Sequence, residues 1–197
     1  MKKPIVINLF AGPGAGKSTA AAFIFSQLKM KGVNCELITE FAKDKTWEKN
    51  YSALRCQEYV FGKQSYKMDR CRDQVDVIIT DSPLPLGVFY NQNPVLGPHY
   101  EHLVMDVFNT YDNINFFINR KKPYNPVGRN QTEEEAKEID VRIKKFLESH
   151  DIYYWIMDGT EEGYTRICDE VWRYIHKVRM EECIRNEYDN FATEYYD

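Results

Sequence analysis

The chain has 197 residues, a formal net charge of −4 at pH 7 and 43% hydrophobic residues. This length fits one domain with a substantial core. The negative charge excludes an overall basic field that would hold nucleic acid non-specifically, although it does not exclude a local basic groove.

No stretch approaches the ~18 uncharged apolar residues of a membrane span. The N-terminal residues enter a strand pattern directly, without the apolar core of a signal peptide. The five cysteines are scattered and include no CxxC pair, which favours reduced thiols. We therefore expect a cytoplasmic protein with no membrane partner.

The first predicted strand, residues 5–10, leads into the glycine-rich segment 11–19, with the sequence AGPGAGKST. A helix pattern over 17–30 follows. Strand, glycine loop and helix in this order predict a phosphate-binding loop, with Ala11 in place of the first glycine. Small residues let successive backbone N–H groups turn around a phosphate chain, and the helix N-terminus adds its positive end.

Within this loop, Lys17 can reach the β- and γ-phosphates, and the Ser18 hydroxyl can ligate Mg²⁺. The pattern therefore predicts binding of a nucleoside triphosphate, taken here as ATP, together with Mg²⁺. The sequence does not separate ATP from GTP. The predicted nucleotide-binding residues are Gly12, Pro13, Gly14, Ala15, Gly16, Lys17, Ser18 and Thr19.

Further strand patterns alternate with helix patterns along the rest of the chain. The other predicted strands cover 35–39, 75–80, 114–119 and 152–157, and the other predicted helices cover 47–73, 98–109, 132–149 and 161–180. Alternation of this kind predicts βαβ units, a parallel sheet and an α/β fold. In such sheets the ligand lies beyond the carboxyl ends of the strands, so residues directly after each strand are the first candidates for a site.

Acidic residues follow the second and third predicted strands. Asp81 comes after the apolar run 77–79, which is the arrangement of the acid that holds Mg²⁺ in phosphate-loop proteins. Glu40 is the candidate base that orients or deprotonates an acceptor hydroxyl, with Lys43 beside it as a substrate contact. The reverse assignment of the two acids stays open, and each could instead be a helix cap or a loop acid.

The helix predicted over 47–73 places apolar residues at three-, four- and seven-residue intervals, which favours a core stripe. That stripe comprises Trp47, Tyr51, Leu54, Phe61 and Met68. Two polar residues off the stripe are candidate acceptor contacts. Gln64 could read a base edge, and Arg55 could clamp a phosphate. A solvated polar face is the alternative.

The segment 120–132 after the fourth strand packs four cations, two prolines and one glycine into one loop. Phosphoryl transfer needs cations that meet the charge on the transferring group and exclude water, so we interpret this segment as a lid. Arg120 and Arg129 are the candidate transition-state residues, because a guanidinium offers a planar fork of donors. Thr132 and Glu135 then form a capping-box pattern that starts the next helix. An ordinary basic surface loop is the alternative.

The domain is expected to span residues 1–180, and 181–197 form a polar, acidic and aromatic extension. This extension could continue the last helix or wrap back on the domain. Both the extension and the helix at 47–73 could make a homodimer face.

The phosphate loop, the segments 39–44 and 80–83, and the lid stretch 122–135 together resemble small P-loop proteins common in bacteriophage genomes and labelled ATPase or AAA family. More distantly, the chain resembles the nicotinamide riboside kinase domain of NadR, through Glu40, the segment 62–66, Asp81 and Arg129. The resemblance covers residues 4–175. It implies a three-layer nucleoside and nucleotide kinase fold with a five-stranded parallel sheet in the order 2-3-1-4-5.

Three functions remain open at this point. The favoured one is a kinase that moves the γ-phosphate of ATP to a hydroxyl of a nucleoside, a nucleotide or a modified pyrimidine. A related alternative is a kinase that acts on hydroxymethylated pyrimidines within DNA, as some phage P-loop kinases do. The alternative of another class is an NTPase whose nucleotide state switches a binding partner.

Overall fold

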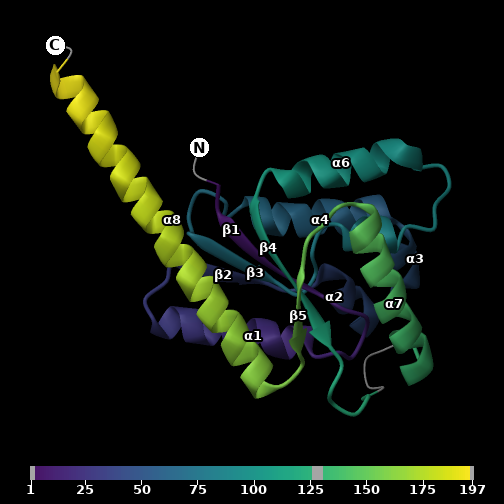
Figure 1. Cartoon of the computed structure of the whole chain (residues 1–197). Coiled ribbons are helices and arrows are strands. Elements are labelled where there is room, and N and C mark those ends of the chain that lie inside the picture. Colours follow the sequence, from purple (N-terminus) through teal and green to yellow (C-terminus); the bar gives the residue numbers. More distant parts are fainter. Residues whose placement is uncertain (1–2, 126–130, 196–197) are drawn as a thin grey trace.

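The computed structural model describes residues 3–125 and 131–195. They form a five-stranded parallel sheet in the order β2-β3-β1-β4-β5, with helices on both faces (Figure 1). This confirms the predicted α/β class and strand order. The strands are β1 (Ile5–Phe10), β2 (Cys35–Ile38), β3 (Val77–Thr80), β4 (Asp112–Asn119) and β5 (Trp155–Asp158).

Eight helices are described in these ranges. They are α1 (Lys17–Met30), α2 (Phe41–Trp47), α3 (Tyr51–Arg55), α4 (Gln57–Asp69), α5 (Leu86–Phe89), α6 (Gly97–Asn109), α7 (Glu133–Ser149) and α8 (Glu161–Tyr195).

The central strand β1 is buried along its whole length, as expected for a parallel strand covered on both faces. Because side chains alternate across a strand, Ile5, Ile7 and Leu9 enter a core cluster with α1 and α8. Val6 faces the other way and joins a second cluster with α4 and α6. Figure 1 shows these two helix pairs on opposite faces of the sheet. The two clusters bury both faces of the sheet, so a site is expected at the ends of its strands.

The helix predicted over 47–73 is wrong as a single element, because α2 ends at Trp47 and the rest of the segment contains two separate helices, α3 and α4. Lys49 adopts a left-handed backbone (φ 53°) between the first two, and Cys56 (φ −89°, ψ 82°) separates the last two. The predicted core stripe fails at its start, since Trp47 is 60% and Tyr51 49% exposed. Its end, in α4, is buried as predicted.

The helix α7 starts with the predicted capping box. The Thr132 side chain accepts from the Glu135 N–H, and the Glu135 carboxylate accepts from the Thr132 N–H. This satisfies two N–H groups that a helix leaves unpaired at its start. The cap therefore fixes where the basic segment before it ends and α7 begins.

The last helix, α8, continues without interruption from Glu161 to Tyr195, so the described part of the extension, residues 181–195, continues the predicted helix rather than wrapping back. Its C-terminal half projects away from the sheet (Figure 1). Within the described ranges, no helix has the length and apolar character needed to cross a membrane.

Candidate active site

The glycine-rich loop adopts the backbone that its sequence predicts. Gly14 (φ 79°) and Gly16 (φ 106°) both take left-handed conformations, which glycine adopts without steric cost. Gly16 is the residue before α1, so the helix begins at Lys17 with its N–H groups facing the loop. The loop is therefore a cradle of backbone donors at the positive end of a helix.

Side chains from later in the chain lie directly on this loop. A Cβ on Gly14 would lie 2.9 Å from the Tyr124 ring, and a Cβ on Gly16 would lie 2.6 Å from the Tyr164 hydroxyl oxygen. Tyr164 also donates to the Gly16 carbonyl oxygen at 3.4 Å. Neither tyrosine was predicted as a site residue, because the sequence does not reveal which residues of the lid segment and α8 return to the loop.

Lys17 folds back over the loop. Its ammonium group donates to the carbonyl oxygens of Ala11 at 2.8 Å and Gly12 at 3.1 Å. Burial lowers the pKa of this ammonium, and the nearby carboxylates of Glu40 and Asp81 oppose that shift. The carboxylates of Glu40 and Asp81 therefore favour the charged form of Lys17 at the loop.

The two acids after strands β2 and β3 meet at the phosphate loop, as the sequence predicted for this edge. Ser18 Oγ donates to Asp81 Oδ2 at 2.5 Å, and the Glu40 N–H donates to Asp81 Oδ1 at 3.1 Å. Asp81 is buried (3% exposed). One carboxylate therefore joins the start of α1 to the end of β2.

Burial raises the pKa of the Glu40 carboxyl. The positive charge of Lys17 opposes this rise, and the negative charge of Asp81 adds to it. A carboxylate with a raised pKa is a stronger base, so it is suited to accept a proton near neutral pH. The environments of Glu40 and Asp81 thus differ, with Asp81 bonded to Ser18 and Glu40 desolvated.

Arg120, the first residue after β4, lies against the phosphate loop and pairs with Asp140 of α7. Arg120 Nε and Nη2 donate to Asp140 Oδ2 at 3.2 and 3.0 Å, while Asp140 Oδ1 accepts from the Gly12 N–H at 2.6 Å. Both side chains are largely buried (9% and 15% exposed). Asp140 was missed because it lies inside a helix, where an isolated acid normally faces solvent.

Three other residues predicted to contact the substrate, Gln64, Lys43 and Arg55, do not join the group of side chains around the phosphate loop. Gln64 is buried and uses its amide within the protein: Oε1 accepts from the Phe41 N–H at 3.1 Å, and Nε2 donates to Thr80 Oγ1 at 3.4 Å. Gln64 thus supports the turn that presents Glu40, and does not leave its amide free to read a base. Lys43 and Arg55 are exposed on α2 and α3. Arg129 lies outside the described residues.

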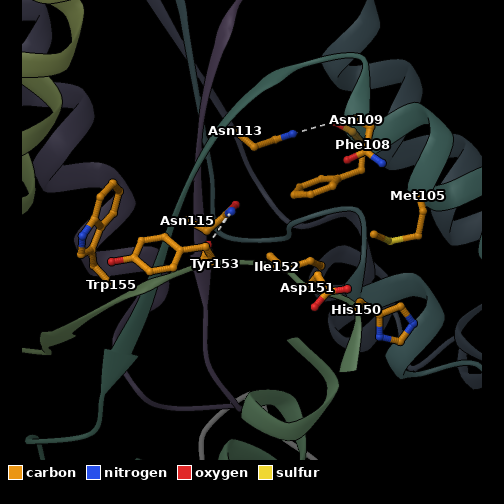
Figure 2. A pocket seen from close by; sticks show the side chains of 10 residues that line it. All are labelled: Met105, Phe108, Asn109, Asn113, Asn115, His150, Asp151, Ile152, Tyr153 and Trp155. Atoms are coloured by element: carbon orange, nitrogen blue, oxygen red, sulfur yellow. Dashed lines mark hydrogen bonds between the residues drawn. The ribbon is translucent and has the colours of Figure 1, made fainter. Parts of the chain in front are cut away.

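A cavity of about 410 Å³ lies at the opposite edge of the sheet, by the amino ends of β4 and β5 (Figure 2). Two of its lining amides are already paired with backbone: Asn113 donates to the Phe108 carbonyl at 2.6 Å, and Asn115 to the Tyr153 carbonyl at 3.0 Å. Because ligands of parallel α/β sheets bind beyond the carboxyl ends of the strands, we place the active site at the phosphate loop.

Comparison with known proteins agrees with this geometry. The family described as "AAA domain" matches residues 6–163, which run from β1 to the start of α8. The chain belongs to this AAA domain family. No curated protein matches the sequence.

Among solved structures, the chain is similar to the NadR protein, whose crystal structure was determined in complex with NR. The TM-score is 0.62 at 14% sequence identity. The match covers 88% of this chain and 52% of the NadR chain, so this chain spans about half the length of that protein. At this identity the likeness establishes a shared fold, a P-loop α/β domain of the type found in NadR.

Proposed function

We propose that this protein is an ATP- and Mg²⁺-dependent phosphotransferase that moves the γ-phosphate of ATP to a hydroxyl group of a nucleoside, a nucleotide or a modified pyrimidine. One observation carries the proposal: Asp81 accepts from the Ser18 hydroxyl and from the Glu40 backbone N–H, which brings the desolvated Glu40 carboxyl beside Lys17. An NTPase needs the first two of these residues for its metal. A desolvated carboxylate just beyond them is suited to an acceptor hydroxyl.

The loop fits a triphosphate because Gly14 and Gly16 take the left-handed backbone of a phosphate-binding turn and because Lys17 supplies a cation at the same place. The Ser18 hydroxyl and the Asp81 carboxylate are the hard oxygen ligands that Mg²⁺ prefers, and both lie at one point of the site. Bound there, Mg²⁺ would offset charge on the phosphate oxygens.

The proposed reaction needs one proton acceptor and two cations from this chain. The acceptor oxygen forms a bond to the γ-phosphorus, and the bond from that phosphorus to the β–γ bridging oxygen breaks, which releases ADP. Glu40 takes the proton of the acceptor hydroxyl. Lys17 and Arg120 stabilise the charge on the transferring group.

Small acceptors are the first to test, since the fold is shared with a protein solved in complex with NR. A hydroxymethylated pyrimidine within DNA is a second acceptor class. The negative net charge of −4 argues against non-specific DNA binding, but not against recognition of one modified base. We further propose a cytoplasmic location, and formation of a homodimer stays a prediction.

The experiment is a transfer assay with γ-labelled ATP and Mg²⁺. Separate reactions contain nucleosides including NR, nucleoside monophosphates, or duplex DNA with hydroxymethylated pyrimidines. We expect the label to enter one acceptor class. Release of all label as inorganic phosphate, at one rate whatever is added, would contradict the proposal and favour a nucleotide-switched NTPase.

A further inference from the structure

Asp140 of α7 holds one carboxylate between the phosphate loop and Arg120. Its Oδ1 atom accepts from the Gly12 N–H at 2.6 Å, and its Oδ2 atom accepts from both Nε and Nη2 of Arg120. The contact with the loop is close, because a Cβ on Gly12 would lie 2.8 Å from Asp140 Oδ1. The position of Arg120 is therefore set relative to the loop by one residue that belongs to neither segment.

The remaining nitrogen of the guanidinium, Nη1, is buried and has no hydrogen-bond partner in the described part of the chain. It lies 3.1 Å from the place that a Cβ on Gly14 would occupy, so it is close to the glycine loop. A buried donor without a partner costs free energy, so proteins normally keep such a group only where it has a function, for example to bind a ligand. An anionic oxygen at the loop would satisfy it with a charge-assisted bond.

We propose that Asp140 is a positioning residue, which orients Arg120 so that Nη1 contacts the transferring phosphoryl group. This inference rests on the proposed function. The carboxylate bonds Nε and Nη2, which fixes the plane of the guanidinium and leaves Nη1 available to a phosphate oxygen at the loop. Preorganised donors of this kind stabilise the transition state more than the ground state.

Asp140→Asn separates the two roles of the carboxylate. The amide oxygen can still accept from the Gly12 N–H, whereas the amide NH₂ would face Arg120 with a donor instead of an acceptor. The matched control is Glu138→Gln, because Glu138 is exposed on the same helix. We expect Asp140→Asn to lower kcat for γ-phosphate loss about 10- to 100-fold. The KM for ATP should change little, and the control should match wild type.

A double-mutant cycle tests whether Asp140 acts through Arg120. If it does, Arg120→Ala combined with Asp140→Asn is no slower than Arg120→Ala alone, since the group being positioned is gone. Equal and independent losses that multiply in the double variant would overturn the proposal.

Chemical rescue measures the activity that added ions restore to Arg120→Ala. If Asp140 only supported the fold, this rescue would not depend on its carboxylate. Millimolar guanidinium ions should restore activity to Arg120→Ala while Asp140 is intact, and should fail when Asp140→Asn is added. Methylammonium ions should rescue Arg120→Ala less, because they lack the planar fork. This comparison of the two ions needs no change at Asp140, so the planar pairing with its carboxylate is tested even if Asp140→Asn does not fold. Equal rescue by the two ions would overturn the proposal.

A binding measurement separates failure of this inference from failure of the proposed function. ADP with aluminium fluoride places a phosphate-like group on the loop whether the natural acceptor is water or an alcohol. We expect Asp140→Asn to weaken this complex about 10-fold or more relative to ADP alone. Unchanged affinity would overturn the role of Asp140. Weakened affinity in a protein that transfers to no acceptor would preserve that role and reject the kinase.

Discussion

Ser18 donates a 2.5 Å hydrogen bond to Asp81, although 63 positions separate the two residues in the sequence. The bond joins the first turn of α1 to the residue after β3. Because β1 and β3 are adjacent parallel strands, the elements that follow them meet at one edge of the sheet. The pair places a hydroxyl and a carboxylate where Mg²⁺ would lie beside a triphosphate.

Asp81→Asn should increase the Mg²⁺ concentration needed for half-maximal activity by about 10-fold or more, because an amide is a weaker and uncharged ligand. A titration of activity against Mg²⁺ at fixed ATP measures this. Asp73→Asn is the control, since Asp73 is exposed and lies away from the loop. An unchanged Mg²⁺ requirement in Asp81→Asn would remove this residue from the metal site.

Lys17→Ala should lower phosphoryl transfer about 10²- to 10³-fold, because it removes the cation that lies over the loop. The measurement is kcat together with the affinity for ATP. Lys145→Ala is the matched control, as Lys145 is exposed on α7. Wild-type activity in Lys17→Ala would mean that triphosphate is not bound at this loop.

Glu40→Gln should lower transfer about 10²- to 10⁴-fold while ATP still binds, because the amide cannot accept the proton of the hydroxyl. In wild type, the pKa of Glu40 is raised by burial, so activity should fall as pH drops through a value above the ordinary 4.5. A pH–rate profile checks this. Full turnover by Glu40→Gln would exclude Glu40 as the base.

The same raised pKa makes a prediction about stability. The folded protein holds the Glu40 proton more tightly than the unfolded chain does, so stability is lost as pH rises from 4.5 through the folded pKa of this group. Glu40→Gln should therefore unfold at a higher temperature than wild type at pH 8. The difference should shrink as pH falls toward 4.5. Melting curves that differ equally at every pH would contradict the burial of this carboxyl.

Gly163→Ala should destabilise the fold by about 1–3 kcal/mol, because the new Cβ would overlap the Asp158 carbonyl oxygen. Gly62→Ala is the matched control on α4. Beyond the backbone of its own helix and its chain neighbours, no atom lies within 4 Å of the position that the new methyl group would take. This control should therefore be neutral or stabilise by up to about 1 kcal/mol. Urea denaturation of both variants measures the difference.

Much of the fold was predictable because its signals are local. The buried run at β1 and the alternation of strand and helix patterns specify a parallel sheet, and Thr132 with Glu135 specifies the start of α7. The break in the 47–73 segment was not predictable from periodicity. It depends on the left-handed backbone of Lys49 and the non-helical Cys56, neither of which is a glycine or proline.

The candidate site divides in the same way. Lys17, Ser18 and Asp81 follow from motif spacing and from the rule that strand ends carry the ligand. Asp140 does not, since its role depends on how α7 packs against Gly12. Gln64 has the residue type of a base-reading contact, yet its amide is used by Phe41 and Thr80. Spacing along the chain identifies local motifs, whereas these pairings depend on tertiary packing.

The most direct test of the central claim follows oxygen isotopes during turnover in H₂¹⁸O with ATP, Mg²⁺ and the mixed acceptors. The account predicts that the transferred phosphate is found as an ester of an acceptor hydroxyl and contains no ¹⁸O, because an alcohol attacks the γ-phosphorus. Inorganic phosphate that carries ¹⁸O, formed at a rate independent of every acceptor, would show that water is the nucleophile and would contradict the account.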